Sequence, residues 1–342
     1  MKEVQNKALK KSSPEESNLV RVGIIGGAGY TGGELIRLLI NHPYVQIIFI
    51  NSNSNANKFV YEVHKDLIGE TYLKFSSEVS NNIDVLFLCV GHGDARKFLE
   101  ENKIDDKIKI IDLSQDFRLS DKSEIGNKKF VYGLPELNKK EIQSANNIAN
   151  PGCFATCIQL GLLPLAKAGI LGDIYTTGIT GSTGAGQSLN ATSHFSWRAN
   201  NISAYKTLNH QHIKEITQSI NQLQKNDKAF VHFVPWRGDF TRGIYVSSVI
   251  DTLLSLEEIK ELYNNFYKDA KFTHVSNVMI DLKQVVNTNK CLIHIEKQGN
   301  KIAIHSTTDN LLKGASGQAL QNMNLMFGLN EDEGLKLKAA GF

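Results

Sequence analysis

Short apolar runs alternate with amphipathic stretches in the first part of the chain. Four of these runs are mostly apolar, at 19–25, 45–52, 83–91 and 108–114. Such runs are typical of strands that are covered on both faces. After the first run, the segment ELIRLLINH places three leucines on one helical face and ends before Pro43. The pattern predicts an α/β domain over 19–150, with a Rossmann-type, doubly wound parallel sheet.

The hydrophobic pattern changes after residue 150. The segments IYTTGITGSTGAG and FVHFVPWRGDFTRGIYVSSVI are rich in β-branched residues and interrupted by glycines, whereas QHIKEITQSINQL has helical periodicity. We therefore expect an α+β domain at 151–314 with a mostly antiparallel sheet. The segment GQALQNMNLMFGL predicts a C-terminal helix, at about 315–342, that packs back on the first domain. Residues 1–18 are polar and charged, so we expect a disordered tail there.

Composition excludes several classes of protein. The chain has 38 basic and 35 acidic residues, scattered along its length, which gives no general reason to expect nucleic-acid binding. No apolar segment reaches the roughly 18 residues that are needed to span a membrane. The four cysteines are too dispersed for a disulfide scaffold, and no signal-peptide pattern opens the chain. We expect a cytoplasmic protein with reduced thiols that binds neither nucleic acid nor membrane.

A glycine-rich turn joins the first strand to the first helix. Gly26, Gly29 and Gly32 form a GxxGxxG pattern there, where glycines allow a pyrophosphate to approach the backbone and the helix N-terminus. This context favours nucleotide binding over a purely structural turn. The second strand ends in INSNSNANK, which carries no acid to bond the ribose hydroxyls and is followed by Lys58. NADP(H) is therefore favoured over NAD(H), with a plain polar turn as the alternative.

Two cysteines lie at the front of the apolar segment NPGCFATCIQLG. Pro151 suits the start of a helix, which places Cys153 in the first turn and Cys157 one turn later on the buried face. The helix dipole favours a thiolate at the first position and is expected to lower the pKa of Cys153. CxxxC is neither a dithiol redox motif nor half of a usual zinc site. Cys153 is thus a candidate nucleophile, although a small buried cysteine remains the simpler interpretation.

The segment LNHQHIKEI carries groups that could act with a nucleophilic thiol. His210 and His212 are candidate acid/base groups, and Glu215 lies about one helical turn from His212. A metal site is the poorer interpretation, because no further cluster of ligands stands out.

Two further regions offer candidate contacts to a ligand. TGSTGAG, at 180–186, is either a glycine loop that lies against a nicotinamide or substrate, or a plain turn. Arg118 follows a strand of the parallel sheet, where a guanidinium suits phosphate or carboxylate. Arg237, Asp239 and Arg242 of WRGDFTRGIY either bind a ligand or form surface ion pairs.

The combination of these segments is more specific than any one of them. GGAGYTGGELIRLL, DLSQDFRL, YGLPEL, NPGCFAT, GSTGAG, HQHIKEI and GASGQALQNMNLM, in this order, resemble the N-acetyl-γ-glutamyl-phosphate reductase family of arginine biosynthesis. The resemblance extends from about residue 20 to the C-terminus. Aspartate-semialdehyde dehydrogenases share the architecture and a thiol mechanism, but their sequence differs around the cysteine and at the C-terminal end.

The resemblance implies an oxidoreductase and assigns roles to particular residues. It implies NADPH-dependent reduction of N-acetyl-L-glutamyl 5-phosphate to the 5-semialdehyde through a thioester on Cys153, with release of phosphate. The implied catalytic residues are Cys153, His212, His210 and Glu215, with His212 favoured over His210 as the acid/base. The expected cofactor-binding residues are Gly26, Gly29, Tyr30, Thr31, Gly32, Ser52, Asn53, Ser182 and Gly184. The expected substrate-binding residues are Arg118, Asn150, Arg237 and Arg242, and no metal is expected.

The resemblance also implies a homodimer or homotetramer in which 151–314 is the catalytic and dimerisation domain. Three alternatives stay open at this point. The substrate could carry an N-succinyl group, whose added carboxylate would need a cation such as Arg198 or Arg237. The enzyme could instead resemble aspartate-semialdehyde dehydrogenase, or the chain could be a nucleotide-sensing protein with an inert cysteine. Asn53 and Asn57 stand where many relatives have an arginine and a glycine.

Overall fold

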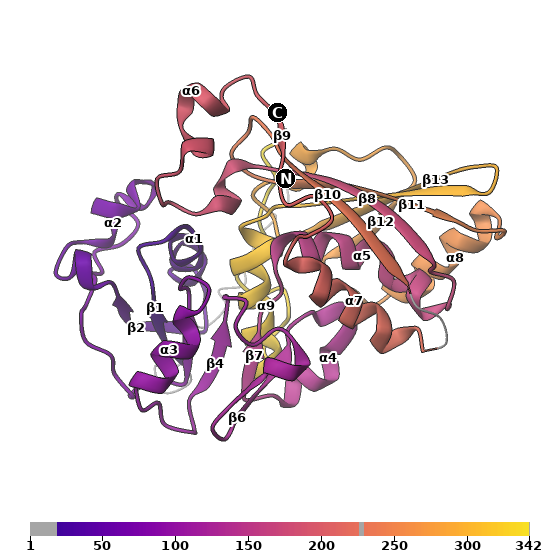
Figure 1. Ribbon diagram of the computed structural model, residues 1–342. Helices are drawn as coiled ribbons and strands as arrows, with labels where there is room; N and C mark the ends of the chain where they lie inside the picture. The colour runs from indigo at the N-terminus through magenta and orange to yellow at the C-terminus, as the bar shows by residue number, and fades with distance from the viewer. Residues whose placement is uncertain (1–18, 226–228, 342) are drawn as a thin grey trace, which may run out of the picture.

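The computed structural model describes residues 19–225 and 229–341, so the tail predicted at 1–18 lies outside the described residues. Its first sheet runs in the order β2-β1-β3-β4-β7-β6-β5 (Figure 1). The strands are β1 (Val20–Ile25), β2 (Val45–Asn51), β3 (Val85–Leu88), β4 (Lys109–Asp112), β5 (Glu124–Ile125), β6 (Lys128–Tyr132) and β7 (Asn147–Ala149). The helices of this part are α1 (Tyr30–Leu39), α2 (Val60–Val63), α3 (Asp94–Glu101) and α4 (Pro135–Ser144).

The first sheet is covered on both faces, as its apolar runs predicted. Val85 and Phe87 of β3 join a buried cluster with residues of α1, whereas Leu86 and Leu88 join another with Ala95 of α3. Strands β1 to β4 and β7 pair in parallel, and β6 extends this order, while β5 pairs antiparallel with β6. The predicted Rossmann-type parallel sheet is confirmed.

The second sheet runs in the order β12-β13-β14-β11-β8-β10-β9. Its strands are β8 (Asp173–Thr180), β9 (Ser203–Ala204), β10 (Phe230–Arg237), β11 (Ile244–Asp251), β12 (Thr273–Ser276), β13 (Cys291–Gln298) and β14 (Lys301–Thr308). Its helices are α5 (Cys153–Lys167), α6 (Phe195–Arg198), α7 (His212–Leu223) and α8 (Leu256–Tyr267). The pairs β8–β10 and β12–β13 are parallel and the other pairs are antiparallel, so the prediction of a mostly antiparallel sheet is confirmed.

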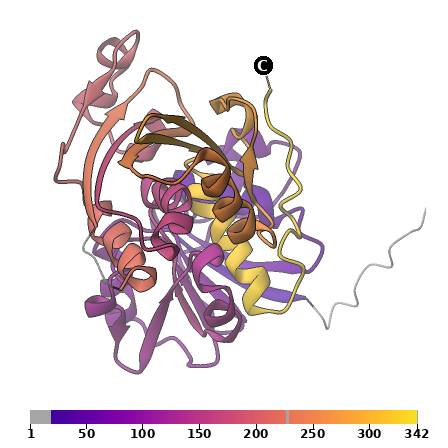
Figure 2. The same cartoon turned by 90° about the vertical axis from the view of Figure 1, so that its right-hand side faces the viewer.

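Helix α9 (Gly317–Met326) lies in the middle of the molecule, between the two sheets (Figures 1 and 2). Ala319, Leu320 and Met323 pack in the same buried cluster as β1 and α1. The helix is shorter than the predicted 315–342. It ends because Gly328 adopts the left-handed conformation (φ +67°) and the Leu329 N–H bonds back to the Asn324 carbonyl, which closes the last turn.

A single π-helical turn, η8 (Leu312–Ser316), leads directly into α9. Within the described part of the chain, the helices are too short or too polar to cross a bilayer.

Candidate active site

Cys153 is the first residue of α5, at the point where the chain leaves β7 and turns at Pro151. Gly152 caps the helix in an extended conformation (φ −72°, ψ 153°). Cys153 is half-buried, whereas Cys157 is fully buried one turn later, with its sulfur 3.5 Å from the Ser306 hydroxyl. The different environments predicted for the two cysteines are confirmed.

The electrostatics of Cys153 differ from the prediction. Burial raises the pKa of its thiol above the ordinary value, and this outweighs the lowering by the Phe154 backbone N–H and by the Arg118 charge. The expectation that the helix dipole would bring the pKa into a reactive range was therefore wrong. Full burial raises the pKa values of Cys89 and Cys157 further, to about 12.

The His212 ring packs directly against Gly152, the residue before the nucleophile. A side chain at Gly152 would lie 2.7 Å from His212 Cε1 and closer still to Nε2. Nε2 is 3.7 Å from Glu215 Oε1, and Nδ1 is buried without a hydrogen-bond partner among the described residues. Burial, and then the nearby His210, lower the pKa of His212 well below its usual value. The imidazole is therefore neutral at pH 7 and can accept a proton.

Glu215 ties together segments that are distant in the sequence. Its carboxylate accepts hydrogen bonds from the Tyr132 hydroxyl (2.8 Å), the Gly152 backbone N–H (3.1 Å) and Arg118 Nη1 (3.4 Å). Its side chain and that of Arg118 are both almost fully buried. Glu215 thus fixes the residue before Cys153 and lies beside His212, whereas its catalytic role stays a prediction.

His210 lies beside His212, and aromatic rings surround it on one side. Its Nδ1 accepts the His212 backbone N–H at 3.3 Å, and its ring lies edge-on to Phe154 and Phe233. Burial lowers the pKa of His210 to about 4. This geometry suits support of the His212 backbone better than proton transfer.

Arg118 and Asn150 mainly hold the segment that leads to Cys153. Arg118 Nε donates to the Asn150 carbonyl (2.8 Å) and Nη2 donates to the Leu113 carbonyl (3.0 Å). The Asn150 amide donates to the Ala315 carbonyl (3.0 Å) and accepts from Asn322 (3.1 Å). Substrate binding by these two residues stays a prediction.

Arg237 and Arg242 lie in different surroundings. The Arg237 guanidinium stacks on the Tyr205 ring at 4.8 Å, and its Nε is buried without a hydrogen-bond partner among the described residues. Burial, and then the nearby Cys153 sulfur, raise the pKa of Tyr205 to about 12. Arg242 instead forms ion pairs with Glu34 and Asp309, and the structure does not bring it together with the other predicted substrate-binding residues.

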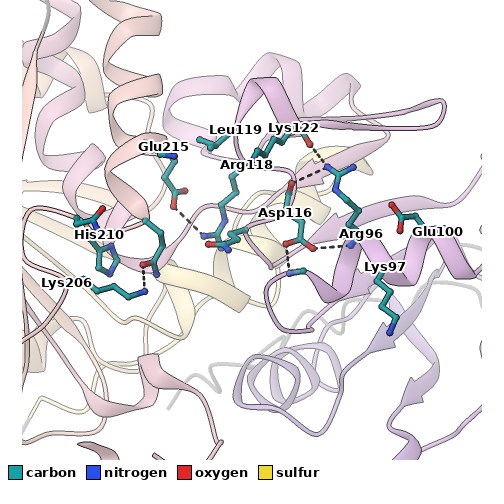
Figure 3. Close-up of a pocket in the computed structure, with 15 residues that line it drawn as sticks. Arg96, Lys97, Glu100, Asp116, Arg118, Leu119, Lys122, Lys206, His210 and Glu215 are labelled. Atoms are coloured by element: carbon teal, nitrogen blue, oxygen red, sulfur yellow. Dashed lines mark hydrogen bonds and ion pairs between the residues drawn. The ribbon is translucent and has the colours of Figure 1, made fainter.

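A cavity of about 740 Å³ opens beside Arg118, His210 and Glu215 (Figure 3). It lies between α3 and the 115–122 segment on one side and the 206–215 segment on the other. Its charged lining residues and histidine are Arg96, Lys97, Glu100, Asp116, Arg118, Lys122, Lys206, His210, Lys214 and Glu215. Basic side chains outnumber acidic ones, which suits an anionic ligand. Lys206 also lines this cavity, close to His210, and its left-handed backbone conformation (φ +47°) has no signal in the sequence.

The glycine turn before α1 has the geometry of a dinucleotide-binding loop. Gly26 has a φ of +76°, and a side chain there would collide with the Cys89 carbonyl. A side chain at Gly32 would lie 2.7 Å from the Gly26 carbonyl oxygen, whereas one at Gly29 would make only an ordinary contact with the same oxygen, at 3.6 Å. Helix α1 begins at Tyr30, so the free N–H groups of its first turn face the loop. A buried histidine that the sequence analysis missed, His64, supports this loop through its Nε2 and the Gly27 carbonyl (2.8 Å).

Two of the other predicted cofactor residues, Tyr30 and Ser182, line a second hollow, of about 930 Å³. Most of the residues between 186 and 197 also line it, whereas Thr31, Ser52, Asn53 and Gly184 do not. Thr31 follows Tyr30 in α1, and its carbonyl accepts the Ser316 hydroxyl at 2.8 Å.

The segment after β2 fits a phosphorylated ribose. Ser52 is buried and accepts a hydrogen bond from Asn55 (3.2 Å), Asn53 is exposed, and residues 52–58 contain no acid that would repel a 2′-phosphate. No cluster of three or more histidines, cysteines or acids is placed to hold a metal ion in the part of the chain that the structure describes.

Comparisons with known proteins agree with this geometry. Residues 21–145 match the semialdehyde dehydrogenase, NAD binding domain, and residues 153–310 match the semialdehyde dehydrogenase, dimerisation domain. A Bacteroides thetaiotaomicron protein named N-acetyl-gamma-glutamyl-phosphate reductase is 56% identical over 326 residues, which cover 95% of this chain and 100% of the relative. A protein of the same name from Christiangramia forsetii is 54% identical over 325 residues, with 95% and 100% covered.

The solved structures similar to this chain share its fold at low sequence identity. Aspartate semialdehyde dehydrogenase II from Vibrio cholerae has a TM-score of 0.70 and 15% identity, with 90% of this chain and 98% of that chain covered. The aspartate semialdehyde dehydrogenase from Candida albicans, solved with NADP, has a TM-score of 0.65 and 14% identity, with 90% and 98% covered.

Proposed function

The chain belongs to the N-acetyl-γ-glutamyl-phosphate reductase family, and from this premise we propose that it reduces N-acetyl-L-glutamyl 5-phosphate to the 5-semialdehyde. The reaction consumes NADPH and a proton and releases phosphate. The observation that carries the proposal is the neutral His212 imidazole packed on Gly152, one residue before Cys153 at the start of α5.

Cys153 and His212 carry out the first half of the reaction. The Cys153 sulfur bonds to the acyl carbon while its proton passes to His212, and the bond from carbon to the phosphate oxygen breaks with its electron pair going to phosphate, which takes up from solvent the proton that the overall reaction consumes. The free N–H groups in the first turn of α5 are the candidates for holding the developing oxyanion. The Gly152 N–H and the Asn150 amide are not counted among these candidates, because the first already donates to Glu215 and the second is held by Ala315 and Asn322.

In the second half of the reaction, His212 donates its proton to the reduced substrate and later takes that proton back. When bound, NADPH supplies the hydride that reduces the acyl carbon. The protonated His212 gives its proton to the oxygen of the resulting hemithioacetal. It takes that proton back as the carbon–sulfur bond breaks, with the electron pair returning to Cys153, and the aldehyde leaves. Proton transfer from His212 to the sulfur then restores the neutral pair.

The charged groups around the cleft suggest how the substrate is held. We assign the substrate carboxylate to Arg237, because its buried Nε has no partner among the described residues and it stacks on Tyr205 beside the nucleophile. The phosphoryl group is assigned to the basic cavity, where Lys206 and the remaining N–H groups of Arg118 are available. Arg242 is left out of the substrate site because two carboxylates already hold it.

The cellular setting and the assembly follow from the family. We propose that the enzyme works in the cytoplasm as a homodimer or homotetramer, which the match to a dimerisation domain at 153–310 supports. Sedimentation at several protein concentrations distinguishes the two assemblies from a monomer.

The reverse reaction tests the proposed function. N-acetyl-L-glutamate 5-semialdehyde, phosphate and NADP⁺ should yield NADPH, which is followed by its absorbance, and turnover should require phosphate. N-succinyl-glutamate semialdehyde and aspartate semialdehyde serve as parallel substrates. Cys153→Ser should abolish turnover, whereas the matched variant Cys157→Ala should keep most of it. Absence of phosphate-dependent turnover with every aldehyde would reject an acyl-phosphate reductase, and full activity of Cys153→Ser would reject the nucleophile.

A further inference from the structure

The π-helical turn η8 lies between the nucleophile and the glycine-loop helix. Gly314 packs so closely on Cys153 that a side chain at Gly314 would lie 2.8 Å from the Cys153 Cβ. The next residue, Ala315, accepts the Asn150 amide at 3.0 Å, and Ser316 donates its hydroxyl to the Thr31 carbonyl at 2.8 Å. One turn therefore contacts the cysteine, the segment before it and the start of α1. Such π-helical turns are rare and are often found at functional sites.

A buried carboxylate fixes the shape of this turn. Asp309 Oδ1 accepts the backbone N–H groups of Leu311 (2.8 Å) and Leu312 (3.1 Å). The Asp309 carbonyl accepts the Gly314 N–H at 2.9 Å, which is one of the hydrogen bonds that make the turn π-helical. The Asp309 side chain is fully buried, so any displacement of its carboxylate would move the backbone of η8.

Arg242 connects this carboxylate to α1. Its Nε and Nη2 each donate to Asp309 at 3.1 Å, and its Nη1 donates to Glu34 Oε1 at 2.6 Å. Arg242 belongs to the turn between β10 and β11, whereas Glu34 belongs to α1. The planar guanidinium of Arg242 thus holds Glu34, which lies in α1, and Asp309, which follows β14, at a fixed separation.

We propose that Glu34, Arg242 and Asp309 form a clasp that couples occupation of the glycine loop to the position of Cys153. The coupling passes from α1 through Arg242 and Asp309 to η8 and its Gly314 contact. Arg242 and Asp309 are accordingly positioning residues and not substrate ligands. This inference deepens the proposed function and rests on it for the role of Cys153. It also explains why the GASGQ motif has a glycine at 314, where only a hydrogen atom fits against the nucleophile.

The coupling can be measured on the full-length protein without turnover. The ligand is 2′-phosphoadenosine 5′-diphosphoribose, which contains the pyrophosphate and 2′-phosphate of NADP but has no nicotinamide that could cover the thiol. Alkylation of Cys153 by iodoacetamide is followed by mass spectrometry of its peptide, with and without saturating ligand. The variants are Arg242→Met, Arg242→Lys and Glu34→Gln. The matched control is Arg37→Met, because Arg37 pairs with Glu34 (2.7 Å) but lies outside the clasp.

The clasp predicts a specific pattern across these proteins. Ligand should change the wild-type alkylation rate by about fivefold or more, the lower end of the range typical of coupling between sites. The change should disappear in Arg242→Met and Glu34→Gln, persist in Arg37→Met and return in part in Arg242→Lys. Ligand affinity should stay within about threefold of wild type in every variant. Arg242→Met should also lower kcat by about tenfold with little change in the KM for the aldehyde.

Three results would overturn the clasp. The first is that ligand does not change the alkylation rate of Cys153 in the wild type, and the second is that it changes this rate equally in Glu34→Gln and in the wild type. The third is a raised KM with unchanged kcat in Arg242→Met, which would make Arg242 a substrate ligand. Glu34→Gln is nearly isosteric, so it decides the matter if Arg242→Met does not fold. Failure of the proposed function would look different: the wild type would show no phosphate-dependent turnover, while the alkylation pattern would remain.

Discussion

Substitution of Gly152 by alanine tests the position of His212 most directly. The backbone at Gly152 is extended (φ −72°, ψ 153°), a conformation that alanine adopts freely, so the added methyl group acts only through space. That methyl group would lie 2.7 Å from both His212 Cε1 and Arg118 Nη1, whereas ordinary contacts begin at 3.4 Å. The His212 ring must therefore move by about 0.7 Å or more.

A displacement of this size has a known order of magnitude in catalysis. A shift of about 1 Å in a catalytic group costs up to about 100-fold in rate. We expect Gly152→Ala to lower kcat/KM by about 30- to 100-fold, which corresponds to about 2 to 3 kcal/mol in the activation free energy. Affinity for NADP⁺ should not change, because the atoms nearest to a side chain at Gly152 belong to His212 and Arg118 and not to the glycine loop.

The assay is the reverse reaction with N-acetyl-L-glutamate 5-semialdehyde, phosphate and NADP⁺. Gly172→Ala is the matched control, because an added side chain there meets no atom within 4 Å, and it should keep wild-type activity. Thermal unfolding of both variants separates loss of catalysis from loss of folded protein. A kcat/KM for Gly152→Ala within threefold of wild type would show that the His212 ring against Gly152 takes no part in the reaction.

Three other predictions concern the remaining groups of the site. His212→Gln should lower kcat by about 10²- to 10⁴-fold, the range for loss of a general acid/base, whereas His210→Gln should lower it by less than about tenfold. If the larger loss occurred in His210→Gln in the same assay, the roles of the two histidines would be exchanged. Because burial raises the pKa of Cys153, its iodoacetamide alkylation without cofactor or substrate should increase about tenfold per pH unit up to at least pH 9. A plateau between pH 6 and 8 would mean a stabilised thiolate. Arg237→Met should raise the KM for the aldehyde by about 30-fold or more at unchanged NADP⁺ affinity, and an unchanged KM would remove Arg237 from the substrate site.

The parts of the fold that the sequence predicted are those with strong local patterns. Strands β1 to β4 were recognisable because their side chains are apolar on both faces, and the start of α5 was marked by Pro151. Strands β5 and β7 were missed because they are only two and three residues long, and β6 was missed because its sequence, KKFVY, begins with two lysines and shows no apolar run. The end of α9 was missed because its apolar residues continue past the residue at which Gly328 stops the helix.

The candidate site was predictable where its residues lie close together in the sequence. Cys153 in NPGC and His212 in HQH could be found from residue type and spacing alone. The partners of Arg242 could not, because Asp309 and Glu34 are separated from it by 67 and 208 residues, and only the packing of the two sheets brings them together. The pKa of Cys153 could not be predicted either, since it depends on how deeply the helix start is buried.

Cys153 and His212 are both largely uncharged in the resting state, because burial disfavours the charged form of the thiol and of the imidazole. Burial raises the pKa of Cys153 and lowers that of His212, so the proton stays on sulfur until an acyl carbon is close enough to receive the electron pair. Once His212 accepts that proton, the Glu215 carboxylate at 3.7 Å stabilises the new positive charge. In the resting state the same carboxylate is balanced by Arg118 at 3.4 Å, so its charge is already fixed in place before the reaction begins. Burial disfavours the positive charge that develops on His212 during attack, and the nearby Glu215 carboxylate, already held in place, offsets part of that cost.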